Sequence, residues 1–358
     1  MKILDRYILK KFLTTFFFLV LILIAVILVI DYTEKSDDFI EHNLDVSYIF
    51  LEYYANYIPF MINTLSPISV FIAVVFVTSR LASHTEIVAM LSSGTSFLRL
   101  LYPYFLGAAF LAVITFFMVG WVIPNAAKKK VAFEVAYIKG PFYFDQRNIH
   151  LKSNDSTYVY MESYNNRTKS GYKFTLEKIK DRKLLEKLTA TRVKWDTTQL
   201  KWHIKNYKVH SFEGQTEKIW EGSDMDTALN VTPKYFESTF HLNETMTLDE
   251  LDEFIENRIK TGAGGTESYL NEKHERYAYP FAIIVLTMMG VVVSAKKSRQ
   301  GSGFQIAIGF MFAFFYIIFV MMSRSLASGG GVPPQLAAWL PNITFSIISV
   351  VMYFTVPR

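Results

Sequence analysis

Two aspartates in the polar middle of the chain have a spacing that suggests metal chemistry. Asp224 and Asp226 flank Met225, as in some metal-binding carboxylate pairs, but two-residue patterns of this kind are common by chance. The seven histidines are scattered over 358 residues, and no two are spaced as ligands on one helical face. We therefore expect no metal site, no cofactor and no catalytic constellation.

Motifs for nucleotide hydrolysis and for common hydrolases are absent. The sequence contains no G-x-x-x-x-G-K-[ST], no H-E-x-x-H and no G-x-S-x-G. It contains no cysteine, which excludes disulfides and thiolate metal sites. A net charge of +5 is too weak to indicate nucleic acid as a partner. If the protein moves a substrate, we expect the energy to come from another chain.

One short segment has the pattern of a helix that must dock on something. Ser83 and Glu86 have capping-box spacing, and Gly94 is placed to end the helix. The apolar residues between them are Ile87, Val88, Met90 and Leu91. These signals predict a helix over about residues 84–93, too short to be stable alone. Its docking site is either the lipid surface or the chain's own span ends, or else a groove on a partner.

Long apolar segments determine the class of protein. Hydrophobic residues make up 51% of the chain and charged residues only 19%. Six segments contain no Asp, Glu, Lys or Arg, and each can cross about 30 Å of hydrocarbon as a helix. They are Phe12–Ile30, Tyr53–Ser79, Leu100–Ala127, Tyr277–Ala295, Phe304–Ser323 and Ser325–Pro357. We therefore predict an α-helical membrane protein with six transmembrane helices.

The charges predict how these spans are used and oriented. The six segments contain no Asp, Glu, His, Lys or Arg, which argues against ion-coupled transport, because coupling usually needs such a group within the membrane. Ten Lys and Arg residues lie on the N-terminal side of the membrane in the span ends and short loops, against two on the other side. This bias predicts that both termini are cytoplasmic and that the polar block lies outside.

The polar block is predicted to be an inserted all-β, jellyroll-like domain. Five runs rich in Val, Thr, Ile, Tyr and Trp alternate with turn residues. These runs are Tyr158–Tyr164, Tyr172–Ile179, Thr189–Trp195, Lys201–Phe212 and Glu217–Trp220. A helix follows, with Thr247 and Glu250 as a capping box and Gly262 at its end. The predicted domains are residues 1–127 (first membrane half), 128–276 (β domain and helix) and 277–358 (second membrane half).

Charge is distributed unevenly along this block. Arg167–Lys208 has thirteen basic and four acidic residues, whereas Glu213–Glu256 has twelve acidic and two basic ones. Two interpretations remain open: these are solvated faces of an exposed domain, or one of them meets an anionic ligand or partner.

The order of these features resembles the LptF/LptG family of lipopolysaccharide-export permeases. The matching residues extend over nearly the whole chain, and no single motif is unique. They are Leu4–Ile8, Glu86–Gly94, Trp121–Pro124, Trp195-Asp196 with Lys201-Trp202, Arg276 with Pro280, Gly329–Pro334 and Ala338–Asn342. The N-terminal Leu-Asp-Arg-Tyr and the acidic stretch after the first span are closer to LptG than to LptF.

The resemblance implies a non-catalytic transport subunit of the bacterial inner membrane, in contact with membrane lipids. It implies a heterodimer with an LptF-like second permease, above an LptB-like ATPase dimer. The β domain, in the periplasm, would pass lipopolysaccharide to an LptC-like bridge protein. The segment at 84–93 matches the family's coupling helix, whose glutamate faces a basic groove on the ATPase. The implied ATPase-coupling residues are Glu86, Ile87, Met90, Leu91 and Gly94.

The same resemblance suggests cations for the phosphates of lipid A, which need Lys or Arg near the outer interface. The family places basic residues just beyond the first and third spans. The candidates here are Lys35, Lys128, Lys129, Lys130 and, from its location alone, Arg324. Lys35 stands among four acidic residues, which departs from the more basic family pattern. The alternative for each cation is that it only extends toward the interface.

The sequence therefore supports two hypotheses for the function. One is a permease that extracts lipopolysaccharide, powered by a separate ATPase. The other is a mechanotransmitting or scaffolding subunit of an ABC complex that carries no lipid itself. A membrane enzyme that modifies envelope glycans ranks last, because no catalytic constellation supports it.

Overall fold

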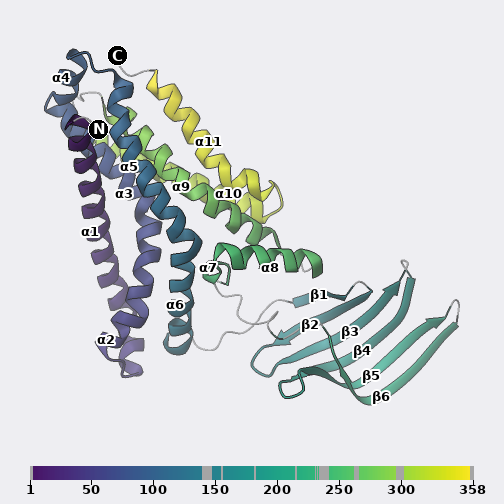
Figure 1. The fold of residues 1–358 in the computed structure, drawn as a ribbon. Coiled ribbons are helices and arrows are strands. Elements are labelled where there is room, and N and C mark those ends of the chain that lie inside the picture. The colour runs from purple at the N-terminus through teal and green to yellow at the C-terminus, as the bar shows by residue number, and fades with distance from the viewer. Residues whose placement is uncertain are drawn as a thin grey trace. The chain divides into compact units, whose positions relative to one another are not determined.

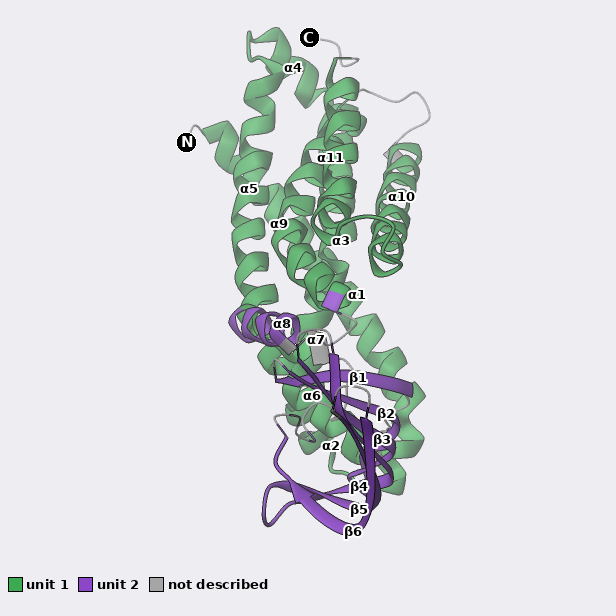
Figure 2. Ribbon diagram, turned by 90° about the vertical axis from the view of Figure 1, so that its right-hand side faces the viewer, with its two compact units in different colours: residues 1–138, 244–248, 267–358 green, residues 139–243, 249–266 purple. Residues whose placement is uncertain are grey.

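The computed structural model describes residues 3–138, 147–154, 156–180, 183–213, 216–229, 231, 233, 242–261, 266–295 and 302–354. The chain forms two compact units, which Figure 2 distinguishes by colour. The helical unit contains residues 1–138, 244–248 and 267–358, and the sheet unit contains residues 139–243 and 249–266.

The first three spans are helices that continue beyond the charge-free segments, and Figure 1 draws these helices in purple to blue. The second and third spans each contain a π-helical segment, η1 and η2. The elements are α1 (Ile3–Glu41), α2 (Val46–Tyr48), η1 (Ile49–Tyr54), α3 (Ala55–Ser83), α4 (Glu86–Ser92), α5 (Phe97–Phe117), η2 (Met118–Val122) and α6 (Ile123–Tyr137). Helix α6 thus carries the three consecutive lysines at 128–130 on an ordered helix.

The second half of the chain adds the other three spans. Its helices are α7 (Leu242–Thr245), α8 (Leu248–Thr261), α9 (Thr266–Ser294), α10 (Ser302–Ser328) and α11 (Pro334–Tyr353). Six helices in the described part of the chain are long and apolar enough to cross a membrane, as predicted. Helix α8 begins directly after Thr247, as expected, whereas Gly262 lies outside the described residues.

The predicted start of the last span at Ser325 is wrong. Residues up to Ser328 complete α10, and the chain then turns through Gly330. Gly330 has φ +73°, a left-handed conformation that glycine adopts without steric cost. Pro334 then opens α11, a position where a helix needs no backbone donor. Hydropathy alone missed this boundary because the turn residues are uncharged.

Glycines allow close contact between the helices. At Gly107 of α5, an added Cβ would lie 2.7 Å from Cε1 of Phe12 in α1. At Gly309 of α10, it would lie 3.1 Å from Cε1 of Phe71 in α3. Small residues at such crossings let helix backbones approach where van der Waals packing supplies much of the association energy.

In the described part of the sheet unit, six antiparallel strands pair in chain order as one sheet. They are β1 (Arg147–Asn154), β2 (Thr157–Asn165), β3 (Ser170–Lys180), β4 (Lys183–Asp196), β5 (Lys201–Glu213) and β6 (Thr216–Thr227). The predicted all-β insertion is confirmed, and β2 to β6 contain the five predicted runs. Strand β1 was not predicted, because it has only two large apolar residues, Ile149 and Leu151.

One face of the sheet carries its hydrophobic core. Trp195 and Trp202 are register partners on β4 and β5, with ring centroids 5.2 Å apart. The Trp202 indole is fully buried, and its N–H donates to the carbonyl oxygen of Val231 at 2.6 Å. This bond satisfies the one polar group of a buried indole. The paired tryptophans of the Trp195-Asp196 and Lys201-Trp202 motifs therefore form part of this core.

Candidate functional site

The segment at residues 84–93 forms a helix, α4, that starts later than predicted. Helix α3 continues through Ser83, whose hydroxyl donates to the carbonyl of Arg80 at 2.9 Å. Thr85 precedes α4 in a left-handed conformation (φ 60°), without a side-chain cap. The predicted capping box at Ser83 is wrong, because the preceding helix extends through this residue.

The end of this helix agrees with the prediction. Gly94 has φ +85°, and its N–H donates to the carbonyl of Leu91 at 3.0 Å. The N–H of Thr95 donates to the carbonyl of Met90 at 3.2 Å. This pair of bonds is a Schellman motif, which satisfies the last carbonyls of a helix and favours glycine in the left-handed position.

The apolar side of α4 packs on the chain's own helices. Ile87 is 2% exposed and belongs to a core cluster with Ile8 and Phe12 of α1. Met90 and Leu91 pack against the same cluster. The sequence left several docking sites open for this helix. In the structure, Ile87, Met90 and Leu91 dock on the ends of the chain's own spans. The exposed side of α4 presents Val88, Ala89 and Ser92.

The side chain of Glu86, the first residue of α4, contacts the first turns of α1. Its Oε2 accepts a hydrogen bond from the Tyr7 hydroxyl at 3.1 Å, and its Oε1 lies 4.0 Å from Nζ of Lys11. One residue pair nearby is tighter: Nη2 of Arg99 in α5 lies 2.6 Å from Oδ2 of Asp5, whose side chain is buried. Figure 1 shows α4 beside the N-terminal end of α1. Residue type and spacing alone did not indicate a role for Asp5, Tyr7 or Lys11, although Leu4–Ile8 belongs to the family resemblance.

At the other end of α1, Lys35 is bound by its own chain. Its Nζ lies 2.6 Å from Oδ1 of Asp31, with the two side chains 18% and 11% exposed. The same ammonium group hydrogen-bonds the Tyr53 hydroxyl and lies 5.6 Å from the ring centroid of Tyr57. The charge of this phosphate candidate is thus neutralised within the helical unit.

The structure separates the three consecutive lysines of α6. Lys130 points into the same aromatic group: its Nζ lies 3.5 Å from Oε1 of the buried Glu134 and 5.1 Å from the Tyr57 ring centroid. Lys128 and Lys129 are exposed, and Lys128 donates to Oδ1 of Asn125 at 3.4 Å. Tyr57 therefore contacts both Lys35 and Lys130, which the sequence placed far apart.

Arg324 at the end of α10 is joined to α9. Its Nη2 lies 2.7 Å from Oε2 of Glu272 and 3.4 Å from Oε2 of Glu275, and its side chain is half exposed. Glu272 also accepts from Nε of the buried Arg276 at 3.0 Å. Arg276 in turn donates to the carbonyl of Met246 at 2.6 Å. This arrangement gives the Arg276 motif a structural role.

The carboxylates that neutralise these cations are not among the residues predicted for the site. Asp31 and Lys35, Lys130 and Glu134, and Glu272 and Arg276 are each four residues apart on one helix. This spacing could have predicted the ion pairs, because residues four apart are neighbours on a helix surface. The emphasis on charge-free segments excluded these pairs, since they lie just beyond the segment ends.

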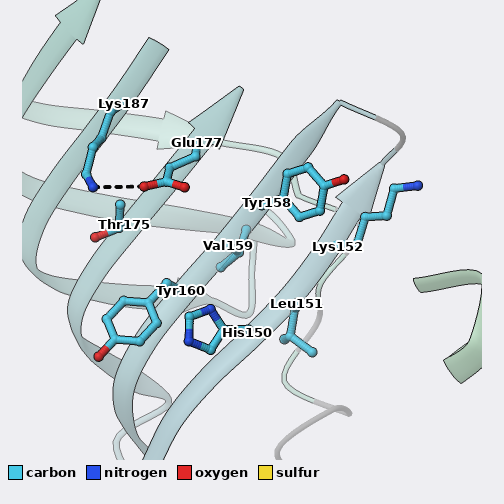
Figure 3. Close-up of a pocket in the computed structure, with 9 residues that line it drawn as sticks. All are labelled: His150, Leu151, Lys152, Tyr158, Val159, Tyr160, Thr175, Glu177 and Lys187. Carbon is cyan, nitrogen blue, oxygen red and sulfur yellow. Dashed lines mark ion pairs between the residues drawn. The ribbon is translucent and has the colours of Figure 1, made fainter. Parts of the chain in front are cut away.

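The polar face of the sheet contains a hollow of about 590 Å³, shown in Figure 3. His150 and Tyr160 from β1 and β2 have ring centroids 4.8 Å apart on its floor. Glu177 and Lys187 from β3 and β4 form an ion pair of 2.8 Å, drawn as a dashed line. These side chains are polar partners of one another on the face opposite the tryptophan core.

The aspartate pair that suggested metal chemistry lies on β6. Asp224 and Asp226 contact the two ring nitrogens of His203 on β5, at 3.1 and 2.8 Å. Lys208 and Glu221 pair across the same strands at 3.2 Å. Within the described ranges, no group of three or more His, Cys, Asp or Glu side chains is arranged to hold a metal ion. Basic β5 and acidic β6 therefore neutralise each other through cross-strand pairs.

A known protein family matches the chain over the helices and strands described above. Residues 6–354 match the family model described as lipopolysaccharide export system permease LptF/LptG. The match covers nearly the full chain, including the helices of both halves and the inserted sheet. A comparison with curated proteins found no match. With six membrane-type helices, an inserted antiparallel sheet and this match, the chain belongs to the LptF/LptG family of lipopolysaccharide export permeases.

Proposed function

We propose that this chain is the transmembrane permease subunit of an ABC exporter that extracts lipopolysaccharide from the inner membrane. In this proposal the lipid passes through the sheet unit toward a bridge protein, and a separate ATPase dimer supplies the energy. Family membership supports the permease role. The absence of a P-loop motif from the sequence supports placing ATP hydrolysis on a partner.

The observation that carries the coupling part of the proposal is the position of α4. Ile87 is buried in a core cluster with residues of α1, α3 and α5, so a force applied to the other side of α4 is transmitted to these spans. Its exposed side, with Val88, Ala89 and the one-third exposed Glu86, remains for a partner. A basic groove on an ATPase subunit fits this side, because Glu86 is its one carboxylate.

The exposure of the spans supports a second permease and a lipid substrate. Only 17% of the most apolar part of α1 and 22% of that of α10 are buried within this chain, against 61% for α9. Large side chains such as Phe18, Leu21 and Phe314 are more than half exposed. We propose that α1 and α10 provide the surfaces for an LptF-like permease and for acyl chains. Holding acyl chains there avoids a cost of about 0.8 kcal/mol for each CH₂ exposed to water.

The outer cations divide into two groups under this proposal. Lys128, Lys129 and the half-exposed Arg324 are the candidates for lipid A phosphates. Lys35 and Lys130 hold helices together, because their side chains are only 18% and 14% exposed and lie between a carboxylate and the Tyr57 ring. Arg324 also has carboxylate partners, Glu272 and Glu275, but half of its side chain stays exposed.

The sheet unit supports a bridge partner. Strands β1 and β6 are the two ends of the sheet, so each pairs with a single strand among those described. Free strand edges can accept a further strand from another chain. We propose that an LptC-like protein continues the sheet at one of these edges.

The test is assembly with the ATPase. Glu86→Ala and Glu86→Lys should weaken copurification of the ATPase, with Glu86→Lys the stronger because it places a cation against a basic groove. Thermal unfolding of the permease should change little, since Glu86 is partly exposed. Glu41→Lys, an exposed carboxylate at the other end of α1, is the matched control. Wild-type assembly by both Glu86 variants would contradict the coupling role.

Lipid capture separates the permease from a scaffolding or mechanotransmitting subunit. A photo-crosslinker at Lys128 or Lys129 should capture lipopolysaccharide in the assembled, ATP-driven complex. An assembled and hydrolysing complex that gives no lipid adduct at Lys128, Lys129 or Arg324 supports the scaffolding alternative instead.

A further inference from the structure

The first three turns of α1 contact both α4 and α5 through charged and polar side chains. Asp5 binds Arg99 of α5 at 2.6 Å, whereas Tyr7 and Lys11 face Glu86 of α4. Tyr7 and Lys11 are four residues apart, so they lie on one side of α1. The Lys11 ammonium also hydrogen-bonds the Tyr7 hydroxyl and lies 4.1 Å from its ring centroid.

These two contacts differ in how easily they can be rearranged. The Asp5 carboxylate is 3% exposed and pairs with Arg99 at hydrogen-bond distance, so breaking that pair leaves a buried charge. The Lys11 and Glu86 side chains are 38% and 33% exposed and lie 4.0 Å apart, so solvent screens their attraction. Asp5–Arg99 therefore anchors α1 to α5, while the contact at Glu86 can adjust.

The Glu86 carboxylate can accept more than these two partners. An ionised carboxylate has about four acceptor positions. The Tyr7 hydroxyl occupies one of them at 3.1 Å, and Lys11 remains beyond hydrogen-bond distance. The exposed third of the side chain leaves acceptor positions for a cation from another protein.

We propose that Tyr7 and Lys11 are positioning residues for Glu86. They orient its carboxylate toward a cationic group of the ATPase partner, and they join that contact directly to α1. A displacement of α4 by the partner is then transmitted to α1 as well as to its chain neighbours α3 and α5. This inference rests on the proposed coupling function of Glu86.

The build of α1 suits it to transmit such a displacement. It is one continuous helix of 39 residues without Pro or Gly, about 58 Å long at 1.5 Å per residue. Helix α3 contains Pro59 and Pro67 and follows a π-helical segment, and α5 contains Pro103. Prolines and π-helical segments are where helices bend. The rigid route from the coupling helix to the opposite end of the bundle is therefore α1.

The test compares conservative variants in the reconstituted complex with its ATPase and second permease. Tyr7→Phe removes only the hydroxyl, and Lys11→Met removes only the charge. Each should lower lipopolysaccharide released per ATP hydrolysed by about threefold to tenfold, the effect of losing a partly exposed polar contact that solvent screens. ATPase copurification should fall less than about twofold, because Glu86 itself remains. Tyr102→Phe, whose ring lies 4.9 Å from the Arg99 guanidinium, is the matched control and should leave release unchanged.

A double-mutant cycle separates positioning from a general structural role. In a Glu86→Gln background, Tyr7→Phe should cause little further loss, because the contact that it supports is already weakened. The chain has no cysteine, so single spin labels at Arg6 and Ser92, both exposed, can report on the α1–α4 distance. In the permease alone, Tyr7→Phe should broaden that distance distribution, and Tyr102→Phe should not.

The outcomes distinguish this inference from the proposed function. If Tyr7→Phe and Lys11→Met retain wild-type release per ATP, the positioning role is wrong. An equal loss from Tyr7→Phe in both backgrounds also overturns it, since the residue then acts independently of Glu86. In either case the coupling function stands as long as Glu86→Lys still prevents assembly. Wild-type assembly by Glu86→Lys removes the coupling function itself.

Discussion

The Lys35 ammonium lies 2.6 Å from the Asp31 carboxylate one turn earlier in α1. The second oxygen of Asp31 accepts a hydrogen bond from the Tyr54 hydroxyl at 3.2 Å. A cation expected to meet a lipid phosphate is thus already held by a carboxylate and an aromatic group. This contact links α1 to the second span, which contains both tyrosines that bind the pair.

We predict that Lys35→Met destabilises the helical unit more than it weakens lipid binding. Removing one partner of a mostly buried ion pair leaves the other charge uncompensated, at a cost of about 3 kcal/mol. Denaturant unfolding in mixed micelles measures this cost, and crosslinking at Lys128 measures lipid capture. The double variant Asp31→Asn/Lys35→Met should recover much of the stability, because neither charge then remains. If Lys35→Met abolishes capture without loss of stability, Lys35 is a phosphate ligand after all.

We predict that Gly94→Ala weakens the end of α4. Gly94 has φ +85° with nothing within 4 Å of an added Cβ, so the substitution tests backbone strain alone. A left-handed residue with a Cβ costs about 1–2 kcal/mol. Hydrogen exchange at the amides of Gly94 and Thr95 in the Schellman motif should accelerate, and ATPase copurification should fall. Gly94→Asn should show a smaller effect, because asparagine tolerates this conformation better. Equal exchange in wild type and Gly94→Ala would refute this reasoning.

We predict that Gly107→Ala disturbs the contact between α1 and α5. The added Cβ would lie 2.7 Å from Cε1 of Phe12 and 2.9 Å from Cδ1 of Leu9, so both side chains must move. Overpacking of this kind costs about 1–3 kcal/mol. Thermal unfolding in detergent measures the loss. Gly303→Ala is the control, because nothing lies within 4 Å of its added Cβ. Comparable unfolding temperatures for both variants would contradict the close packing of α1 on α5.

We predict that Asp196 stabilises the turn between β4 and β5 in a pH-dependent manner. Backbone N–H groups of Thr198 and Gln199 donate to its carboxylate at 2.7 and 3.3 Å and lower the pKa of Asp196 below its ordinary value of 3.8. Because the pKa is lower in the folded state, the ionised carboxylate stabilises the turn fully at pH values above its ordinary pKa. This stabilisation is lost as the pH falls through the folded-state pKa. Amide exchange in the turn, compared between Asp196 and Asp196→Asn, should show an advantage of the aspartate at about pH 6 that declines as the pH falls below 3.8. The asparagine keeps the acceptor oxygen but cannot titrate, so an unchanged difference over this range contradicts the prediction.

Several elements could be predicted from local sequence alone because their signals are local. The spans follow from charge-free length, β2 to β6 from runs of β-branched and aromatic residues, and the end of α4 from Gly94. Where a boundary depended on a neighbouring element, the local signal failed. Ser83 carried a helix-start pattern but became the end of α3, and Ser325 joined α10 rather than α11.

The sequence by itself determined the class of the protein: a six-span membrane protein with an inserted sheet and no nucleotide-binding motif. Only the tertiary structure decided which charges are paired within the chain. Lys35 and Lys130 are 95 positions apart in the sequence, but both lie over Tyr57 beside buried carboxylates, whereas the side chains of Lys128 and Lys129 are exposed. The physical reason is that a charge is neutralised by whatever lies within a few ångströms of it. Helix packing brings those partners together, and residue type alone does not encode that packing.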